Sequence, residues 1–342
     1  MLKRKLLKVA AISLLAVLVI SAILSLVGCE KRPDRLYAPF IISPDGEELV
    51  FNIGPPWLNE KPPSVEPRPY VIKLGKDAAF RVIPLPKSLL PMAWRPGASP
   101  PELFGVSRGP DLPNRILAVA VSDSVSTVLS QDLPGELWAW RMAWNPSGQI
   151  LATGIHGPHK NGYLGVSYDK GKNINVTDVV IDGASPVWIN DETLCLQGGN
   201  DILEVNVGGR NPRVTRTIAS GEDVSAEHFY FYLVGSLDGE AVCVLGNEIY
   251  CGGRLLYHSN KWINQIIAEG SYVAFKAGSY VWVLDGKGNV KSKRSIDPNT
   301  TKLIAISPVH KFVYLEKNYQ CIQRYSFVDD DEISTVFDVG VF

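Results

Sequence analysis

One short stretch of the chain has the spacing of a catalytic serine. In Gly105-Val106-Ser107-Arg108-Gly109 a glycine lies two residues on either side of the serine, as in the nucleophile elbow of hydrolases. That elbow needs a strand that runs directly into a helix, so that the hydroxyl is exposed at a sharp turn. Here Pro110 and Pro113 follow at once, in a strand-rich context. We therefore predict no catalytic role for Ser107.

Two histidines lie close enough in sequence to be considered as metal ligands. His156 and His159 are separated by Gly157 and Pro158, and no carboxylate or thiolate stands beside them. A zinc site draws on three or four such ligands, so this pair is a weak set. The acidic run 329–332 lacks the spaced oxygen ligands and the glycine of a calcium loop. We predict no metal and no cofactor.

The N-terminus carries a modification signal at Cys29. Basic residues at positions 3, 4, 5 and 8 precede an apolar run that ends at Leu26-Val27-Gly28-Cys29. This motif resembles the lipobox of bacterial lipoproteins, which implies that 1–28 is a signal peptide and that Cys29 receives lipid, palmitate-type acyl chains included. The alternatives are an uncleaved membrane anchor, because the run is long enough to cross a bilayer, and a chance cysteine. Lipidation implies an extracytoplasmic place in the bacterial cell envelope, tethered to a membrane by several acyl chains.

Two other cysteines, Cys243 and Cys251, are close in sequence and flank Gly246-Asn247-Glu248. A three-residue hairpin loop there would place the two cysteines directly opposite each other, and this spacing permits a cross-strand disulfide. The alternative is that both are small apolar residues packed between sheets. Cys195 and Cys321 have strand-like neighbours, and we expect both to be buried thiols.

The fold follows from a cassette that recurs from residue 37 onward. It holds an apolar strand, a turn rich in Pro, Asp or Gly, and three further strands. Its clearest openings contain Ser43-Pro44-Asp45-Gly46, Trp94-Arg95-Pro96-Gly97 and Trp144-Asn145-Pro146-Ser147-Gly148. Weaker copies begin near residues 187, 235, 267 and 306, and three of these four lack the proline.

These openings resemble the Trp-Ser-Pro-Asp-Gly repeats of the WD40-like propellers found in TolB and in prolyl oligopeptidases. The mean spacing of about 44 residues between Pro44 and Pro308 matches one four-stranded blade per repeat. We predict an all-β chain with a seven-bladed β-propeller at 37–342, after the signal or anchor segment 1–28 and a tether at 29–36. Six or eight blades are alternatives, because the later copies depart from the pattern.

Elementary packing supports the same architecture. A lone four-stranded sheet cannot bury both faces, so each blade must stack on its neighbours, and closing the ring protects the ends. Seven such cassettes are too many for one β-sandwich, and the period is too long for a β-helix. We expect a last strand at 333–342 to close the ring through apolar contact with the first blade. The eight residues of the tether reach roughly 25 Å, which holds the propeller near the membrane.

The longest departures from the cassette all follow its second strand: 54–69, 108–114 and 156–162. Equivalent loops of adjacent blades emerge on one face of a propeller, so we expect these loops to form one partner-binding patch. Six prolines stiffen the first loop, which lowers the entropy lost on binding. The predicted patch contains Trp57, Arg108, Asp111, His156, His159 and Lys160. The alternative is that the loops are tolerated surface insertions.

Composition limits the classes of function. Hydrophobic residues make up 46% of the 342, and four basic residues but no acidic one precede Gly28, which leaves 30 basic against 35 acidic residues in the rest. A mildly acidic domain lacks the basic stripe that nucleic acid needs. The predicted innermost strands are apolar, with Arg141 and His228 the nearest exceptions. We therefore expect a binding or scaffold lipoprotein with a protein, peptide or glycan partner. The alternative is a lyase, lactonase or glycosidase-type propeller enzyme.

Overall fold

The computed structural model describes most of the chain after residue 34. The described residues are 35–54, 68–74, 81–107, 114–133, 137–157, 162–181, 185–199, 201–220, 231–329 and 332–339. They form 28 strands and one short 3₁₀ turn, η1 (Gly208–Arg210). Within these ranges no helix is both long and apolar enough to cross a bilayer.

The strands make seven four-stranded antiparallel sheets, each built from four strands that are consecutive in the chain. Blade 1 holds β1 (Arg35–Ile42), β2 (Glu48–Gly54), β3 (Arg68–Lys73) and β4 (Arg81–Pro84). Blade 2 holds β5 (Leu89–Arg95), β6 (Glu102–Ser107), β7 (Arg115–Val121) and β8 (Val125–Asp132). Blade 3 holds β9 (Trp138–Trp144), β10 (Leu151–His156), β11 (Gly162–Ser167) and β12 (Asn175–Val180). Blade 4 holds β13 (Val187–Trp188), β14 (Thr193–Gly198), β15 (Asp201–Asn206) and β16 (Arg213–Ser220).

The second half of the chain continues the pattern. Blade 5 holds β17 (Phe231–Leu237), β18 (Glu240–Leu245), β19 (Glu248–Cys251) and β20 (Arg254–His258). Blade 6 holds β21 (Ile263–Glu269), β22 (Tyr272–Ala277), β23 (Tyr280–Asp285) and β24 (Val290–Ser295). Blade 7 holds β25 (Thr301–Ser307), β26 (Phe312–Lys317), β27 (Cys321–Ser326) and β28 (Ser334–Asp338).

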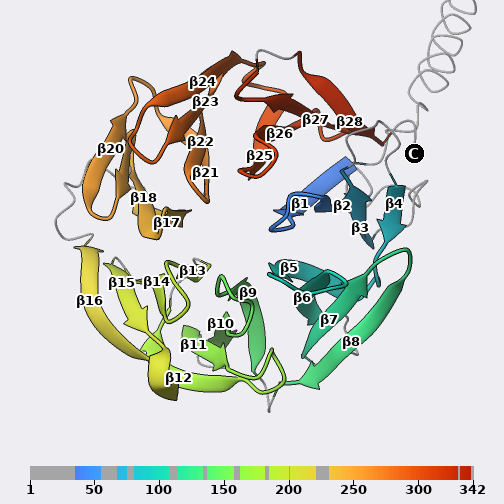
Figure 1. Ribbon diagram of the computed structural model, residues 1–342, viewed down its shortest axis with the longest axis vertical. Coiled ribbons are helices and arrows are strands. Elements are labelled where there is room, and N and C mark those ends of the chain that lie inside the picture. Colours follow the sequence, from blue (N-terminus) through green and yellow to red (C-terminus); the bar gives the residue numbers. More distant parts are fainter. Residues whose placement is uncertain are drawn as a thin grey trace, which may run out of the picture.

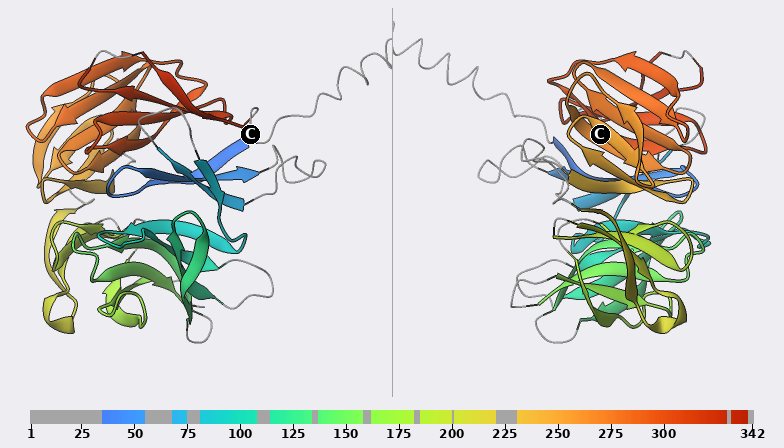
Figure 2. Two further views of the ribbon diagram at one scale, coloured as in Figure 1. Left: turned by 45° about the vertical axis from the view of Figure 1, so that its right-hand side comes forward. Right: turned by 90° about the vertical axis from the view of Figure 1, so that its left-hand side faces the viewer.

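The seven sheets stand around one axis, and the first strand of every blade lies nearest to it (Figure 1). Seen from the edge, the ring is thinner than it is wide (Figure 2). The prediction of a seven-bladed propeller is therefore confirmed, and six or eight blades are excluded. Because the blades stack face to face, the core consists of separate apolar layers between neighbouring blades.

Two tryptophans of the cassette, Trp94 and Trp188, join neighbouring blades. The indole N–H of Trp94 donates to the carbonyl of Ile41 at 3.3 Å, and that of Trp188 donates to the carbonyl of Ala143 at 3.0 Å. In both pairs the acceptor belongs to the innermost strand of the preceding blade. A buried indole needs a partner for its N–H, and this hydrogen bond fixes how far each blade is rotated from the last.

The glycines of the cassette turns allow blades to approach closely. Gly148 has a φ of +66°, a left-handed conformation that glycine adopts without steric cost. A Cβ there would lie 2.2 Å from the carbonyl oxygen of Pro96 in the preceding blade. On the other side, the backbone N–H of Ser147 donates to Asp191 of the following blade at 2.8 Å. The turn residues of the repeat therefore serve packing between blades.

Blade 7 closes against blade 1 without exchanging a strand. The two sheets share one apolar cluster in which the rings of Phe51 and Phe337 lie 4.9 Å apart. The N–H of Leu36 also donates to the carbonyl of Tyr319 at 2.6 Å. Two predicted boundaries shift: β1 begins at Arg35, so buried Leu36 belongs to the propeller and not to the tether, and β28 is shorter than predicted, with 340–342 outside the described residues.

The predicted pairing of Cys243 with Cys251 is wrong by one residue. The hairpin turn contains only Gly246 and Asn247, because Leu245 already pairs with Glu248, and Cys251 therefore lies opposite Val242. A shift of one residue moves a side chain to the other face of the sheet. Cys243 packs with Cys195 in one apolar layer and Cys251 packs in another, and all four described cysteines are free thiols. The alternative of small apolar packing residues describes Cys243 and Cys251 correctly.

Candidate functional site

The second strands of blades 1, 2 and 3 end on the same side of the ring. They end at Gly54, Ser107 and His156, and we call this side the loop face. The first strand of each blade begins there, so β1 enters the ring from the loop face at Arg35. Of the predicted patch, the structure describes His156, whereas Trp57, Arg108, Asp111, His159, Lys160, and also Cys29 and His228, lie outside the described residues.

His156 lies in an aromatic cluster at the loop-face end of blade 3. Its imidazole is stacked on Trp138, with ring centres 4.6 Å apart and planes inclined by 17°, and it also contacts Trp140 at 4.8 Å. The cluster follows from strand pairing, because Trp138 lies opposite His156 and Trp140 opposite Gly154. A Cβ on Gly154 would lie 2.5 Å from the indole nitrogen, so this glycine makes room for the Trp140 ring.

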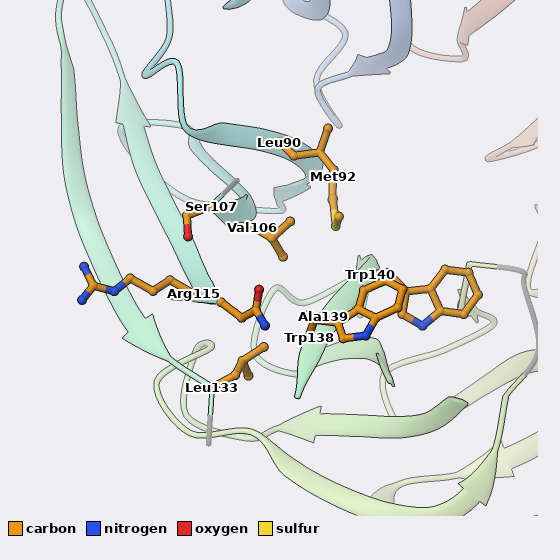
Figure 3. A pocket seen from close by; sticks show the side chains of 10 residues that line it. Leu90, Met92, Val106, Ser107, Arg115, Leu133, Trp138, Ala139 and Trp140 are labelled. Atoms are coloured by element: carbon orange, nitrogen blue, oxygen red, sulfur yellow. The ribbon is translucent and has the colours of Figure 1, made fainter. Parts of the chain in front are cut away.

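The cluster borders a hollow of about 90 Å³ between blades 2 and 3 (Figure 3). This mainly apolar hollow is smaller than the pockets that enclose whole small-molecule ligands, and it has room for one projecting side chain or a group of similar size. Its walls come from β5, β6, β7, the end of β8 and the start of β9. The lining residues are Leu90, Met92, Val106, Ser107, Asn114, Arg115, Leu133, Trp138, Ala139 and Trp140.

Polar groups stand at one edge of this blade 2–3 hollow. The Arg115 guanidinium is ion-paired with Asp132, and the Asn114 amide donates to the carbonyl of Leu137 at 3.1 Å. The indole N–H of Trp140 is buried and has no hydrogen-bond partner in the described part of the chain. The arrangement combines aromatic faces with a polar edge at which the charge of Arg115 is balanced by Asp132. Such a surface suits recognition, and it does not hold a nucleophile beside a general base.

Arg141 follows Trp140 on the strand that borders the channel. It occupies a β-bulge, because Trp140 pairs with Gly154 and Met142 with Thr153, which leaves Arg141 unpaired with a φ of +54°. The side chain is exposed, and no described residue forms an ion pair with it. Arg141 is thus a charged exception on the inner strands, as the sequence predicted.

Exposed aromatic side chains gather on the loop face. Among the described residues, Tyr37, Trp138, Trp262 and Tyr319 are the exposed aromatic ones, with 37% to 46% of their surface accessible. Each lies near the start of a first strand or in a connection between second and third strands. The exposed aliphatic residues lie elsewhere, mostly on outermost strands, as at Val128. Aromatic residues are enriched where proteins bind partners, whereas single exposed aliphatic residues are common on any surface.

Sequence reasoning missed Trp138, Trp140 and Trp262. A usable signal was present in Trp138-Ala139-Trp140, where alternation in a first strand places both indoles beside the predicted loop at 156–162. Concerning metals, no group of three or more His, Cys, Asp or Glu within the described ranges is placed to hold an ion. The predicted histidine pair cannot be described, since only His156 falls inside those ranges.

These features define a seven-bladed β-propeller whose described exposed aromatic side chains lie on its loop face. The sequence matches no protein-family model and no curated protein. Among solved structures, an acylaminoacyl peptidase of Pyrococcus horikoshii aligns with a TM-score of 0.60 and 10% identity, over 92% of this chain but only 54% of the peptidase. An oligogalacturonate lyase in complex with manganese aligns with a TM-score of 0.55 and 13% identity, over 88% of this chain and 89% of the lyase.

A chain of the mitotic checkpoint complex aligns with a TM-score of 0.50 and 11% identity, over 73% of this chain and 82% of its own length. Proteins this different in sequence and activity share the propeller architecture with the present chain. The likeness therefore concerns the fold alone, and function has to be argued from this chain's own surface.

Proposed function

We propose that the protein is a membrane-tethered, extracytoplasmic binding or scaffold lipoprotein whose loop face holds a protein, peptide or glycan partner. The observation that carries this proposal is the gathering of the exposed aromatic residues, Trp138 and Trp262 among them, on that one face. Tryptophan and tyrosine supply large contact area at low conformational cost and are enriched where partners bind. The blade 2–3 hollow beside Trp138 offers a recess for a projecting group.

The entry point of the chain supports the tether. Cys29 stands six residues before Arg35, where β1 begins on the loop face. Six extended residues reach about 20 Å. A lipid on Cys29 would therefore hold the loop face toward the membrane, in the bacterial cell envelope, and would restrict its partners to those near the membrane surface. The relationship to TolB-type, WD40-like lipoproteins and the loop residues Trp57, Arg108, Asp111, His159 and Lys160 belong to the same proposal.

The polarity of the innermost strands favours binding over catalysis. A propeller enzyme of the lyase, lactonase or glycosidase type would bring several acids and bases together at the channel mouth. The described parts of β1, β5, β17 and β25 nearest the channel are mainly apolar, and Arg141 stands alone on β9.

In-cell cross-linking followed by mass spectrometry tests the proposal. The wild-type protein should yield a defined cross-linked partner, and Trp138→Ala should lose it without a lower melting temperature, because 46% of this side chain is already exposed. Leu255→Ala is the matched control, since it removes an exposed apolar residue from the outermost strand β20. Equal cross-linking by all three proteins would refute the role of the loop face.

The tether is tested separately. Cys29→Ala should leave the protein unacylated, as an unprocessed precursor, which labelled fatty acid and mass spectrometry would detect. Normal processing of this variant would contradict the lipoprotein assignment and leave the loop-face test unaffected.

A further inference from the structure

A second hollow opens on the loop face between blades 5 and 6, about 200 Å³ in volume. It lies on the far side of the ring from the blade 2–3 hollow (Figure 1). Its walls come from the end of β20, the connection to β21, the end of β22, the start of β23 and the middle of β24. The lining residues are Tyr257, Ser259, Asn260, Lys261, Ala277, Tyr280, Trp282 and Lys293.

Aromatic rings form one wall of this blade 5–6 hollow. The Trp282 ring lies 6.2 Å from Tyr257 and 6.3 Å from Tyr280, and it is stacked parallel to buried Phe275 with an inclination of 2°. Tyr257 also contacts Phe275 at 5.4 Å. Because Phe275 belongs to the apolar layer between the blades, the wall is anchored in the core and does not depend on a ligand for its shape.

Two lysines supply positive charge at the same place. The Lys293 ammonium lies 4.4 Å from the centre of Trp282 and 4.5 Å from that of Tyr280, so the rings hold it at the wall by cation–π attraction. The Lys261 side chain lies against Gly278, because a Cβ on that glycine would be 2.7 Å from the Cδ of Lys261. The turn between β22 and β23 thus keeps this side chain beside the hollow.

Neither lysine is neutralised by a carboxylate of the described chain. Other described cations do have acidic partners, as in Lys291 with Asp285 at 3.0 Å. Glu248, at the start of β19 in blade 5, is engaged by the Tyr250 hydroxyl at 2.7 Å and by His258 at 3.2 Å. In a chain with a slight excess of acidic residues, two uncompensated ammonium groups at one hollow attract an anion.

The polar rim of the hollow is held in place. Asn247, in the hairpin turn of blade 5, holds the segment that leads to Lys261 through two hydrogen bonds. Its side-chain amide donates to the backbone carbonyl of Ser259 at 2.8 Å, and its backbone carbonyl accepts from the Ser259 N–H at 2.8 Å. The Ser259 hydroxyl accepts from the N–H of Lys261 at 3.2 Å. The segment is therefore ordered in advance, which lowers the entropy lost on binding.

We infer that the blade 5–6 hollow binds a saccharide that carries a carboxylate. Three features have to be matched at once: the lysine ammonium groups, the aromatic wall, and the hydroxyl and amide groups of the rim. The carboxylate of an acidic sugar pairs with Lys261 and Lys293. The C–H face of its ring packs on Tyr257, because Lys293 already lies over the Trp282 ring, and its hydroxyls reach Ser259 and Asn260. This site shares the loop face with the proposed partner surface but is separate from the blade 2–3 hollow.

Isothermal titration of the purified full chain with a hexasaccharide of uronic acid units tests the inference. The acidic hexasaccharide should bind, and a neutral hexasaccharide of the same length should bind at least tenfold more weakly. Lys261→Gln and Lys293→Gln should each weaken binding about tenfold, with unchanged melting temperatures because both side chains are exposed. Lys287→Gln is the matched control, an exposed lysine of blade 6 at the opposite end of the strands.

Several outcomes would overturn the inference. One is failure of the acidic hexasaccharide to bind at millimolar concentration, and another is equal binding of the neutral one. Equally tight binding of a hexaglutamate peptide would show recognition of charge without the sugar ring. Loss of binding in Trp138→Ala but not in the lysine variants would place the saccharide at blades 2 and 3.

Discussion

Replacing Phe337 by alanine should open the junction at which the ring closes. Phe337 lies on β28 and is 7% exposed, and its ring packs on that of Phe51 in blade 1. Around the pair lie Leu36 and Val336, which are 1% and 2% exposed. Blades 7 and 1 each contain four strands of their own, so no continuous ladder of backbone hydrogen bonds crosses this junction. Apolar packing therefore carries most of the closure.

The magnitude follows from the buried surface. A buried phenylalanine removes about 150 Å² or more from water, which at about 25 cal/mol per Å² is roughly 4 kcal/mol. Phenylalanine-to-alanine substitutions in cores cost about 3–5 kcal/mol. Because whole domains are stable by only about 5–15 kcal/mol, we expect the variant to lose a large share of its free energy of unfolding.

Urea unfolding followed by tryptophan fluorescence measures this loss. Val328→Ala is the control, because this residue of blade 7 is 65% exposed and its truncation should change stability by less than about 0.5 kcal/mol. A double-mutant cycle with Phe51→Ala should give a coupling of about 0.5–1.5 kcal/mol between the two rings. A loss below about 1 kcal/mol for Phe337→Ala, or no coupling, would refute closure by apolar packing.

Three further predictions concern the scaffold. Trp188→Phe should cost about 1–3 kcal/mol of unfolding free energy, because the carbonyl of Ala143 loses its donor; an unchanged urea midpoint would contradict the role of the cassette tryptophan. Burial, with the nearby Asp45 carboxylate, raises the pKa of the Glu48 carboxyl above its ordinary 4.5. The folded state therefore binds this proton more tightly than the unfolded state does. As the pH rises through the raised pKa, the unfolding free energy of the wild type should fall relative to that of Glu48→Gln, by on the order of 1 kcal/mol. Urea titrations across this pH range measure the difference, and parallel pH profiles for the two proteins would contradict the prediction. Burial raises the pKa of the Cys195 and Cys243 thiols to about 12, so iodoacetamide at pH 8 should label them only after unfolding, as mass spectrometry would show; labelling of the folded protein would contradict their burial.

Much of the fold could be predicted because a propeller repeats one local pattern. The turn motif at Ser43-Pro44-Asp45-Gly46 and its copies mark where first strands end, and the mean period measures one blade. The innermost strands, such as Met92-Ala93-Trp94 in β5, lie where they were predicted. The predicted pairing of Cys243 with Cys251 was wrong because the same sequence is compatible with a two-residue and a three-residue turn. A shift of one residue in the strand register moves every side chain to the other face of the sheet.

The candidate sites were less accessible to sequence reasoning. Loop length pointed to the side of the ring where second strands end, and of the six predicted patch residues the structure describes only His156, which lies there. Trp138 and Trp140 were not singled out from the sequence, because which of two alternating residues faces solvent depends on the neighbouring blade. Lys261 and Lys293, separated by 31 positions, share a hollow only because blades 5 and 6 stack.

By itself the sequence determined the all-β class, the repeat and the order of strands within each blade, and it favoured seven blades over six or eight. These properties follow from local turn chemistry and from a period that the early copies of the cassette display clearly. The tertiary structure alone decided the contact of Phe51 with Phe337, the registers of the hairpins, and the two hollows on the loop face. Each of these depends on how neighbouring blades are rotated and packed, and packing between distant segments leaves no periodic trace in the order of residues.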